Sequence, residues 1–173
     1  LEAIQKFGNA DALIGHSLGE YTALAISGFF DYVDALKIIS VRGEAMQESV
    51  ENSDTGMAAV LTTDLDATLK EIEVLNSQDI EVWISNYNDA SQIVISSSNE
   101  NLEYLKSNSK ALSARRVIPL EVAGAFHTKI VSPAKPKLAE ALEQVELKDL
   151  PELAQFILAH RETPITLLEA SMG

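Results

Sequence analysis

A serine flanked by glycines is the residue of this sequence best suited to chemistry. Residues 15–19 read G-H-S-L-G, which matches the G-x-S-x-G pattern of a nucleophile elbow with Ser17 at its centre. In such an elbow a strand turns sharply into a helix and presents the serine hydroxyl at the turn. The apolar run 12–14 suits the end of a buried strand. After the motif, the spacing of residues predicts one face of a helix, formed by Leu18, Tyr21, Thr22 and Ala25.

The predicted elbow also explains its neighbouring residues. Side chains in place of Gly15 and Gly19 would collide with the strand and the helix that converge there. Ser17 would lie at a helix N-terminus, where free N–H groups and the helix dipole favour the negative charge of an acyl-transfer intermediate. The backbone N–H of Leu18, which follows the nucleophile, could be the first oxyanion donor. The alternative is that five residues match the pattern by chance.

A serine hydroxyl is a poor nucleophile until a base takes its proton, and His127 is the candidate base. It lies in the stretch G-A-F-H-T at 124–128. A lone histidine is more often structural than catalytic. Here the order of the chain, with the serine first and the histidine last, is compatible with the known elbow folds.

Arg42 is the third residue with a chemical interpretation. Asp31 is predicted to cap a helix that runs to about Val50, and the apolar residues of this helix predict that it is largely buried. A buried guanidinium without a partner is energetically expensive. Arg42 must therefore meet either an internal carboxylate, in a structural salt bridge, or an anionic ligand.

Three motifs together resemble one known family. They are G-H-S-L-G-E-Y-T-A-L at 15–24, R-G-E-A-M-Q at 42–47 and G-A-F-H-T at 124–128. In order and spacing they are similar to malonyl-CoA:acyl carrier protein transacylase, the acyltransferase domain of fatty acid or polyketide synthesis. We see this resemblance over about 11–149. It implies a nucleophile at Ser17, its base at His127, and Arg42 as the group that binds the free carboxylate of the malonyl group.

The resemblance also implies partners and further site residues. The family has an N-x-N-x-x-x-Q stretch beside its active site, which would place Asn86 and Gln92 among the substrate-binding residues; the plain alternative is a hairpin loop over 86–92. The implied substrates are malonyl-CoA and a carrier protein bearing phosphopantetheine. No cofactor and no metal are expected, and the implied location is cytoplasmic.

Composition limits the alternatives. The formal net charge of −13 argues against nucleic acid or an anionic membrane as a partner, because both need a positive surface. Zero cysteines exclude disulfides, thiolate metal sites and a cysteine nucleophile within this sequence. No apolar run approaches the length of a membrane span. The densest basic cluster, formed by Lys110, Arg115 and Arg116, is a candidate carrier-protein contact, although short charge runs are usually solvated faces.

The predicted fold is α/β, with an α/β-hydrolase-like core that has a short parallel sheet and an inserted ferredoxin-like subdomain. Residues 1–55 and 121–173 are assigned to the core. Residues 56–120 are assigned to the subdomain, because their predicted order is strand, helix, strand, strand, helix, strand. Those elements are expected at 57–62, 64–76, 80–85, 92–96, 99–109 and 115–120, with Asn99 as the cap of the second helix. An apolar stripe predicts one more helix, after Pro133.

Departures from the family keep other functions open. Ser97 stands where the family usually has a glycine, which we expect to change a turn locally. We see no resemblance past Asp149, nor the N-terminal loop that gives the family its second oxyanion donor. The sequence therefore reads as incomplete at both ends, and we expect a crippled catalyst. The alternatives are a serine esterase or thioesterase-type hydrolase, and a non-catalytic remnant that binds a carrier protein.

Overall fold

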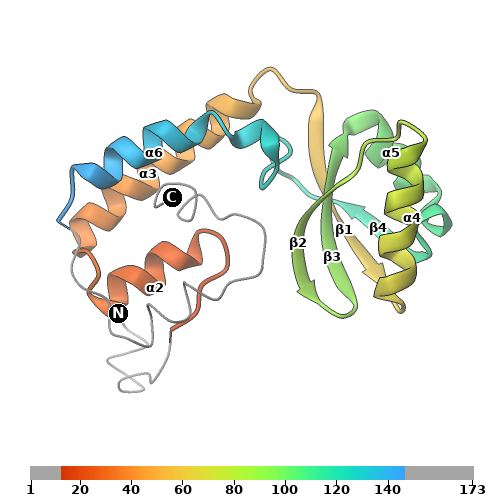
Figure 1. Ribbon diagram of the computed structural model, residues 1–173, viewed down its shortest axis with the longest axis horizontal. Helices are drawn as coiled ribbons and strands as arrows, with labels where there is room; N and C mark the ends of the chain where they lie inside the picture. The colour runs from red at the N-terminus through yellow and green to blue at the C-terminus, as the bar shows by residue number, and fades with distance from the viewer. Residues whose placement is uncertain (1–12, 147–173) are drawn as a thin grey trace. The chain divides into compact units, whose positions relative to one another are not determined.

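The computed structural model describes residues 13–146, which fall into two compact units (Figure 1). One unit takes in residues 1–45 and 135–173, and its described part is helical. The other unit, residues 46–134, contains a four-stranded sheet. We call them the helical unit and the sheet unit. Residues 1–12 and 147–173, which were assigned to the predicted core, lie outside the described residues.

Three helices form the described part of the helical unit: α2 (Gly19–Ser27), α3 (Tyr32–Val50) and α6 (Ala134–Glu143), and the last turn of α3 belongs to the sheet unit. Helix α2 ends at Gly28, whose φ of 83° is a left-handed conformation that glycine adopts at little cost. The predicted cap of α3 is confirmed, because the Asp31 carboxylate accepts from the N–H groups of Val33 and Asp34 at 2.8 and 3.0 Å.

The core of the helical unit lies between these helices. Leu138 and Leu142 of α6 pack with Tyr21, Phe30 and Ile38, and Figure 1 shows α6 running along α3. The expectation that α3 is largely buried is wrong, because Val33 and Leu36 are 60% and 50% exposed. Helix α3 carries apolar residues on more than one of its faces, but only the face that contains Ala35 and Ile38 packs in the core of the helical unit.

The sheet unit has the predicted element order. Its strands are β1 (Thr55–Thr62), β2 (Trp83–Asp89), β3 (Gln92–Ser98) and β4 (Ala114–Pro119), with helices α4 (Leu65–Ser77) after β1 and α5 (Asn99–Ser107) after β3. A short 3-10 helix, η1 (Ser109–Leu112), precedes β4, and a second, η2 (Lys129–Val131), follows the sheet. The strand order is β2-β3-β1-β4 and each neighbouring pair is antiparallel.

The hydrophobic core of the sheet unit lies between one face of the sheet and helices α4 and α5, which cover that face (Figure 1). Ala58 and Val60 of β1 and Ile93 and Ile95 of β3 point into this core, in keeping with the two-residue period of a strand. The intervening residues, among them Ser96, therefore face the opposite side of the sheet.

Two local predictions in the sheet unit are corrected. Asn99 is not the cap of α5; the Ser98 hydroxyl accepts from the N–H of Asn101 at 3.2 Å. The second strand lies at 83–89 rather than 80–85, because the polar residues that indicated a loop continue an edge strand with two register shifts. Edge strands tolerate polar residues and bulges since one side has no strand partner.

Candidate functional site

Ser17 lies in a strained turn directly before helix α2. Its φ is 51°, the left-handed region that a residue with a side chain adopts only under constraint. The turn is closed by N–H groups of Gly19 and Glu20, which donate to the carbonyls of His16 and Ser17 at 2.9 and 3.1 Å. A serine held in this way at the start of a helix is the geometry that the G-x-S-x-G pattern predicts. It argues against a chance match.

The expected strand before the turn is not formed at Leu13 and Ile14, and Ile14 is 89% exposed; Ala12 lies outside the described residues. A strand needs a neighbour with which to form hydrogen bonds, and the described part of the helical unit has no other strand.

The two glycines of the motif differ in their surroundings. A Cβ added to Gly15 would lie 2.1 Å from the backbone carbon of Gly19, far inside any contact distance. A Cβ added to Gly19 would meet no described atom within 4 Å. The steric argument from sequence therefore holds for Gly15, where the chain before the serine touches the first turn of α2, and finds no support at Gly19 among the described residues.

Arg42 of α3 contacts the serine. Its Nη2 donates to Ser17 Oγ at 3.0 Å, and its guanidinium carbon lies 5.6 Å from the centre of the Tyr21 ring. Among the described residues none of the ion pairs involves Arg42, and its buried Nε has no hydrogen-bond partner there. Of the two interpretations left open for Arg42, the internal salt bridge finds no support in this part of the chain.

Tyr21 is a site residue that sequence reasoning counted only as a helix position. It follows Ser17 by four residues, one helical turn, and is 2% exposed. Burial raises the pKa of its phenol and outweighs the opposing effect of the nearby Arg42 cation. Its hydroxyl has no hydrogen-bond partner within 13–146. The sequence did contain a signal for this role of Tyr21, namely an aromatic residue one helical turn after the predicted nucleophile.

Leu18 provides the first backbone N–H after the serine. The carbonyls of His16, Ser17 and Leu18 accept from Gly19, Glu20 and Tyr21, which are the N–H groups that follow it. The Leu18 N–H precedes all of these and lies at the N-terminus of α2, where N–H groups lack an acceptor within the helix. This is the position that the predicted oxyanion donor requires.

His127 lies in the sheet unit, in a loop that is held at several points. Its φ is 56°, so it too has a left-handed backbone. The N–H of Ala125 donates to Thr55 Oγ1 at 3.1 Å, and Thr128 Oγ1 donates to the Ala125 carbonyl at 2.7 Å. A Cβ on Gly124 would lie 2.6 Å from the Cβ of Val50, so this glycine allows a close approach.

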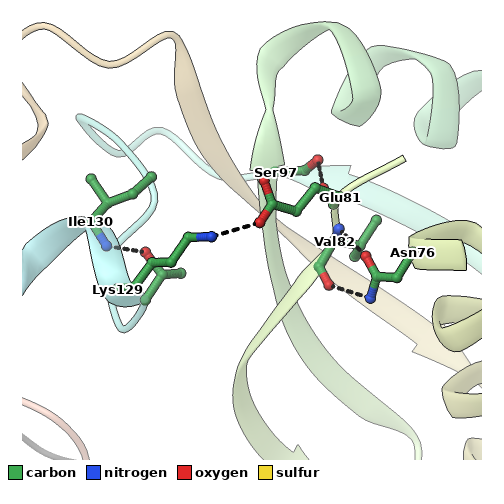
Figure 2. Close-up of polar contacts among 7 residues, drawn as sticks. Asn76, Glu81, Val82, Ser97, Lys129 and Ile130 are labelled. Atoms are coloured by element: carbon green, nitrogen blue, oxygen red, sulfur yellow. Dashed lines mark hydrogen bonds and ion pairs between the residues drawn. The ribbon is translucent and has the colours of Figure 1, made fainter. Parts of the chain in front are cut away.

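An exposed ion pair just after this loop joins Lys129 to Glu81, as Figure 2 shows. Lys129 Nζ lies 2.8 Å from Glu81 Oε1 and 5.3 Å from the centre of the Trp83 ring. The carbonyl of Glu81 accepts a hydrogen bond from Ser97 Oγ. Ser97 therefore lies in strand β3 and not at a turn, which corrects the expectation of a locally changed turn.

Asn86 and Gln92 belong to strands rather than to a loop. Asn86 pairs with Val94 in the β2–β3 ladder, and Gln92 is the first residue of β3. The Gln92 side-chain carbonyl accepts from Asn88 Nδ2 at 2.7 Å. The expected hairpin loop is therefore reduced to a turn at Ala90 and Ser91. The N-x-N-x-x-x-Q stretch spans the β2–β3 hairpin: Asn86 and Asn88 lie in the edge strand β2, and Gln92 begins the inner strand β3.

The remaining observations concern ions and surfaces. Lys110, Arg115 and Arg116 are all exposed, as a solvated face would be. Across residues 13–146 no group of three histidine, cysteine or acidic side chains is arranged to hold a metal ion. Nor does this described range contain a helix of the length and hydrophobicity that a membrane crossing needs.

Comparison with known proteins decides the family. The family described as "Acyl transferase domain" matches residues 1–163. The chain belongs to this acyl transferase family. The match continues past residue 149, so the expected end of the resemblance there is wrong.

Individual members of the acyl transferase family are similar over most of the chain. The malonyl CoA-acyl carrier protein transacylase of Bacillus subtilis is 37% identical over 150 residues, which cover 86% of this chain and 47% of the relative. The crystal structure of the same enzyme from Clostridium perfringens is 35% identical, with a TM-score of 0.73, over 86% of this chain and 47% of that one. The chain spans about half the length of these relatives.

A third relative is known in a complex. It is a malonyl-transacylase bound to its type II PKS acyl-carrier protein, 30% identical, with a TM-score of 0.74, over 90% of this chain and 54% of that one. The α/β fold with its small antiparallel sheet is thus that of solved malonyl transacylases.

Proposed function

We propose that this chain carries the acyltransferase chemistry that moves a malonyl group from malonyl-CoA to the phosphopantetheine thiol of an acyl carrier protein. The observation that carries the proposal is the 3.0 Å hydrogen bond from Arg42 Nη2 to Ser17 Oγ. It places a permanent cation within reach of any acyl group on the serine. A malonyl group has a free carboxylate, and the planar guanidinium fork suits a carboxylate.

The first half of the reaction forms an acyl-serine. His127 accepts the proton of the Ser17 hydroxyl while Oγ attacks the thioester carbonyl of malonyl-CoA. The Leu18 N–H donates to the oxygen that becomes negative in the tetrahedral intermediate. The carbon–sulfur bond then breaks, and coenzyme A leaves with the proton that His127 returns. Throughout, Arg42 binds the distal carboxylate of the malonyl group.

The second half transfers the group to the carrier protein. His127 takes the proton of the phosphopantetheine thiol, whose sulfur attacks the acyl-serine carbonyl. The carbon–oxygen bond breaks and Ser17 regains its proton. Asn86 and Gln92 assist by holding the acyl group. A relative's complex with an acyl-carrier protein supports a carrier protein as partner here. The reaction needs no cofactor, and a cytoplasmic location stays part of this proposal.

We also propose the finer fold assignment. The strand order β2-β3-β1-β4, antiparallel throughout, supports a ferredoxin-like subdomain at residues 56–120. The strained serine before α2 supports an α/β-hydrolase-like core with a short parallel sheet, built from 1–55 and 121–173.

The experiment that tests the function separates transfer from hydrolysis. The chain is mixed with malonyl-CoA, freed of coenzyme A by gel filtration, and then mixed with a phosphopantetheinylated carrier protein. Malonyl-carrier protein should form faster than free malonate, and carrier protein without phosphopantetheine should remain unmodified. Release of malonate at one rate with and without carrier protein would instead identify a hydrolase.

A further inference from the structure

Two buried serines contact the backbone directly before His127. Ser85 of β2 and Ser96 of β3 are 5% and 0% exposed, and their Oγ atoms lie 2.6 Å apart. Both hydroxyls reach the carbonyl oxygen of Phe126, at 3.2 Å from Ser85 and 3.4 Å from Ser96. They lie on the face of the sheet away from helices α4 and α5.

The two hydroxyl protons of Ser85 and Ser96 determine how many hydrogen bonds the Phe126 carbonyl accepts. One proton lies between the two serine oxygens, and either oxygen can be its donor. The other proton remains for the Phe126 carbonyl, from whichever serine does not bridge. In both arrangements the carbonyl accepts one hydrogen bond, and each buried hydroxyl has a partner.

The Phe126 carbonyl belongs to the planar peptide unit that includes the nitrogen and the Cα of His127. Fixing that oxygen fixes the plane, and so limits the rotation about the N–Cα bond that sets φ of His127. The observed φ of 56° is unfavourable for a residue with a side chain, so surrounding contacts must hold it. By holding the Phe126 carbonyl, the two serines help to keep φ of His127 at this unfavourable value.

We propose that the Ser85–Ser96 hydroxyl pair is a positioning device for His127. It holds the Phe126 carbonyl and thereby the strained backbone from which the imidazole projects. The inference rests on the proposed role of His127 as the base for Ser17. The serines touch neither substrate nor reacting atoms, so they are positioning residues.

The test compares Ser85→Ala, Ser96→Ala and the double variant in the full chain. Either single variant leaves one hydroxyl to donate to Phe126, so the rate of Ser17 malonylation at saturating malonyl-CoA should fall by less than about 3-fold. The double variant should lose roughly 10- to 100-fold, with KM for malonyl-CoA nearly unchanged. A rate for the double variant within about 3-fold of wild type overturns the proposal.

The matched control is Thr68→Val. The Thr68 hydroxyl is also buried in the sheet unit, where it donates to Thr62 Oγ1 at 2.9 Å, and within residues 13–146 its hydrogen bonds do not reach the His127 loop. Thr68→Val should lower stability and leave malonylation unchanged. An equal loss of rate in this variant would show general destabilisation, against the proposal. If circular dichroism finds the double variant unfolded, Ser85→Ala with Ser96→Cys, which keeps a weak thiol donor, should give an intermediate rate.

Nuclear magnetic resonance of the His127 imidazole tests the positioning without any activity. The His127→Asn spectrum identifies its resonances, which should shift and broaden in the double variant but not in Thr68→Val. Unchanged resonances in the double variant overturn the proposal. A wild-type chain that forms no malonyl-enzyme would contradict the proposed function instead, and the imidazole spectra would still decide whether the serines hold His127.

Discussion

Arg42 donates a hydrogen bond from Nη2 to Ser17 Oγ, over 3.0 Å, although 25 residues separate the two in sequence. The bond places a cation at the predicted nucleophile before any substrate is present. The serine oxygen is the acceptor in this bond, which uses one of its lone pairs and not its hydroxyl proton. A cation at this distance also favours the alkoxide character that Oγ gains as it attacks.

Replacing Arg42 by alanine should weaken malonyl transfer much more than acetyl transfer. Loss of a partly buried, charge-assisted contact to the substrate carboxylate costs about 2–4 kcal/mol, or roughly 30- to 1,000-fold in kcat/KM for malonyl-CoA. Acetyl-CoA has no such carboxylate, so its rate is the internal control. Arg42→Lys keeps the charge without the planar guanidinium, so its kcat/KM for malonyl-CoA should lie between those of wild type and Arg42→Ala. Equal losses for the two substrates would contradict the role.

Removing the Tyr21 hydroxyl should change how stability depends on alkaline pH. The native state holds the phenol proton more tightly than the unfolded chain, because burial raises its pKa above the ordinary 10.0. The contribution is complete below that value, and it is lost as pH rises through the native pKa. Urea unfolding from about pH 9 to about pH 11 should show a steeper loss for wild type than for Tyr21→Phe. Parallel curves would exclude Tyr21 as the titrating group.

Gly15→Ala and Gly19→Ala form a matched pair within one motif. A Cβ at residue 15 meets backbone at 2.1 Å and cannot be accommodated, so Gly15→Ala should abolish malonylation of Ser17 and destabilise the helical unit. A Cβ at residue 19 meets no described atom within 4 Å and lies in α2, so Gly19→Ala should raise stability by about 0.5–1 kcal/mol. Urea unfolding and mass spectrometry check both, and a tolerated Gly15→Ala would remove the elbow interpretation.

Local sequence patterns predicted turns, caps and the order of helices and strands better than they predicted which side chains are exposed and which residues are in contact. The elbow serine, the Asp31 cap and the order of the sheet unit follow from turn chemistry and periodicity over a few residues. The exposure of Val33 and Leu36 depends on which stripe of α3 meets α6, which the helix's own sequence does not specify. Arg42 indicated a need for a partner, but the identity of that partner depended on the fold.

The hairpin shows the same limit. Residues 86–92 have the composition of a loop, yet pairing with β3 extends β2 to Asp89. Tertiary pairing thus overrode a local turn signal. The hydroxyls of Ser85 and Ser96 carried no sequence signal, since buried serines have no recognisable spacing.

A double-mutant cycle tests the close approach of Gly124 to Val50. Gly124→Ala would bring a Cβ to 2.6 Å from the Val50 Cβ, and the strain should lower the free energy of unfolding by about 1–3 kcal/mol. Val50→Gly removes that Cβ, leaves a cavity and is by itself destabilising. Because each change relieves the other, the double variant should be more stable than the sum of the single losses predicts. Strict additivity in urea unfolding would show that the two residues do not press on each other.

The central claim is that Ser17 takes up a malonyl group, and the mass of the intact protein after mixing with malonyl-CoA tests it most directly. A parallel sample receives acetyl-CoA, and Ser17→Ala, folded by circular dichroism, is the control. The account predicts a malonyl adduct on wild type that exceeds any acetyl adduct and is absent from Ser17→Ala. A folded wild-type chain without an adduct, or an adduct that persists in Ser17→Ala, would contradict it.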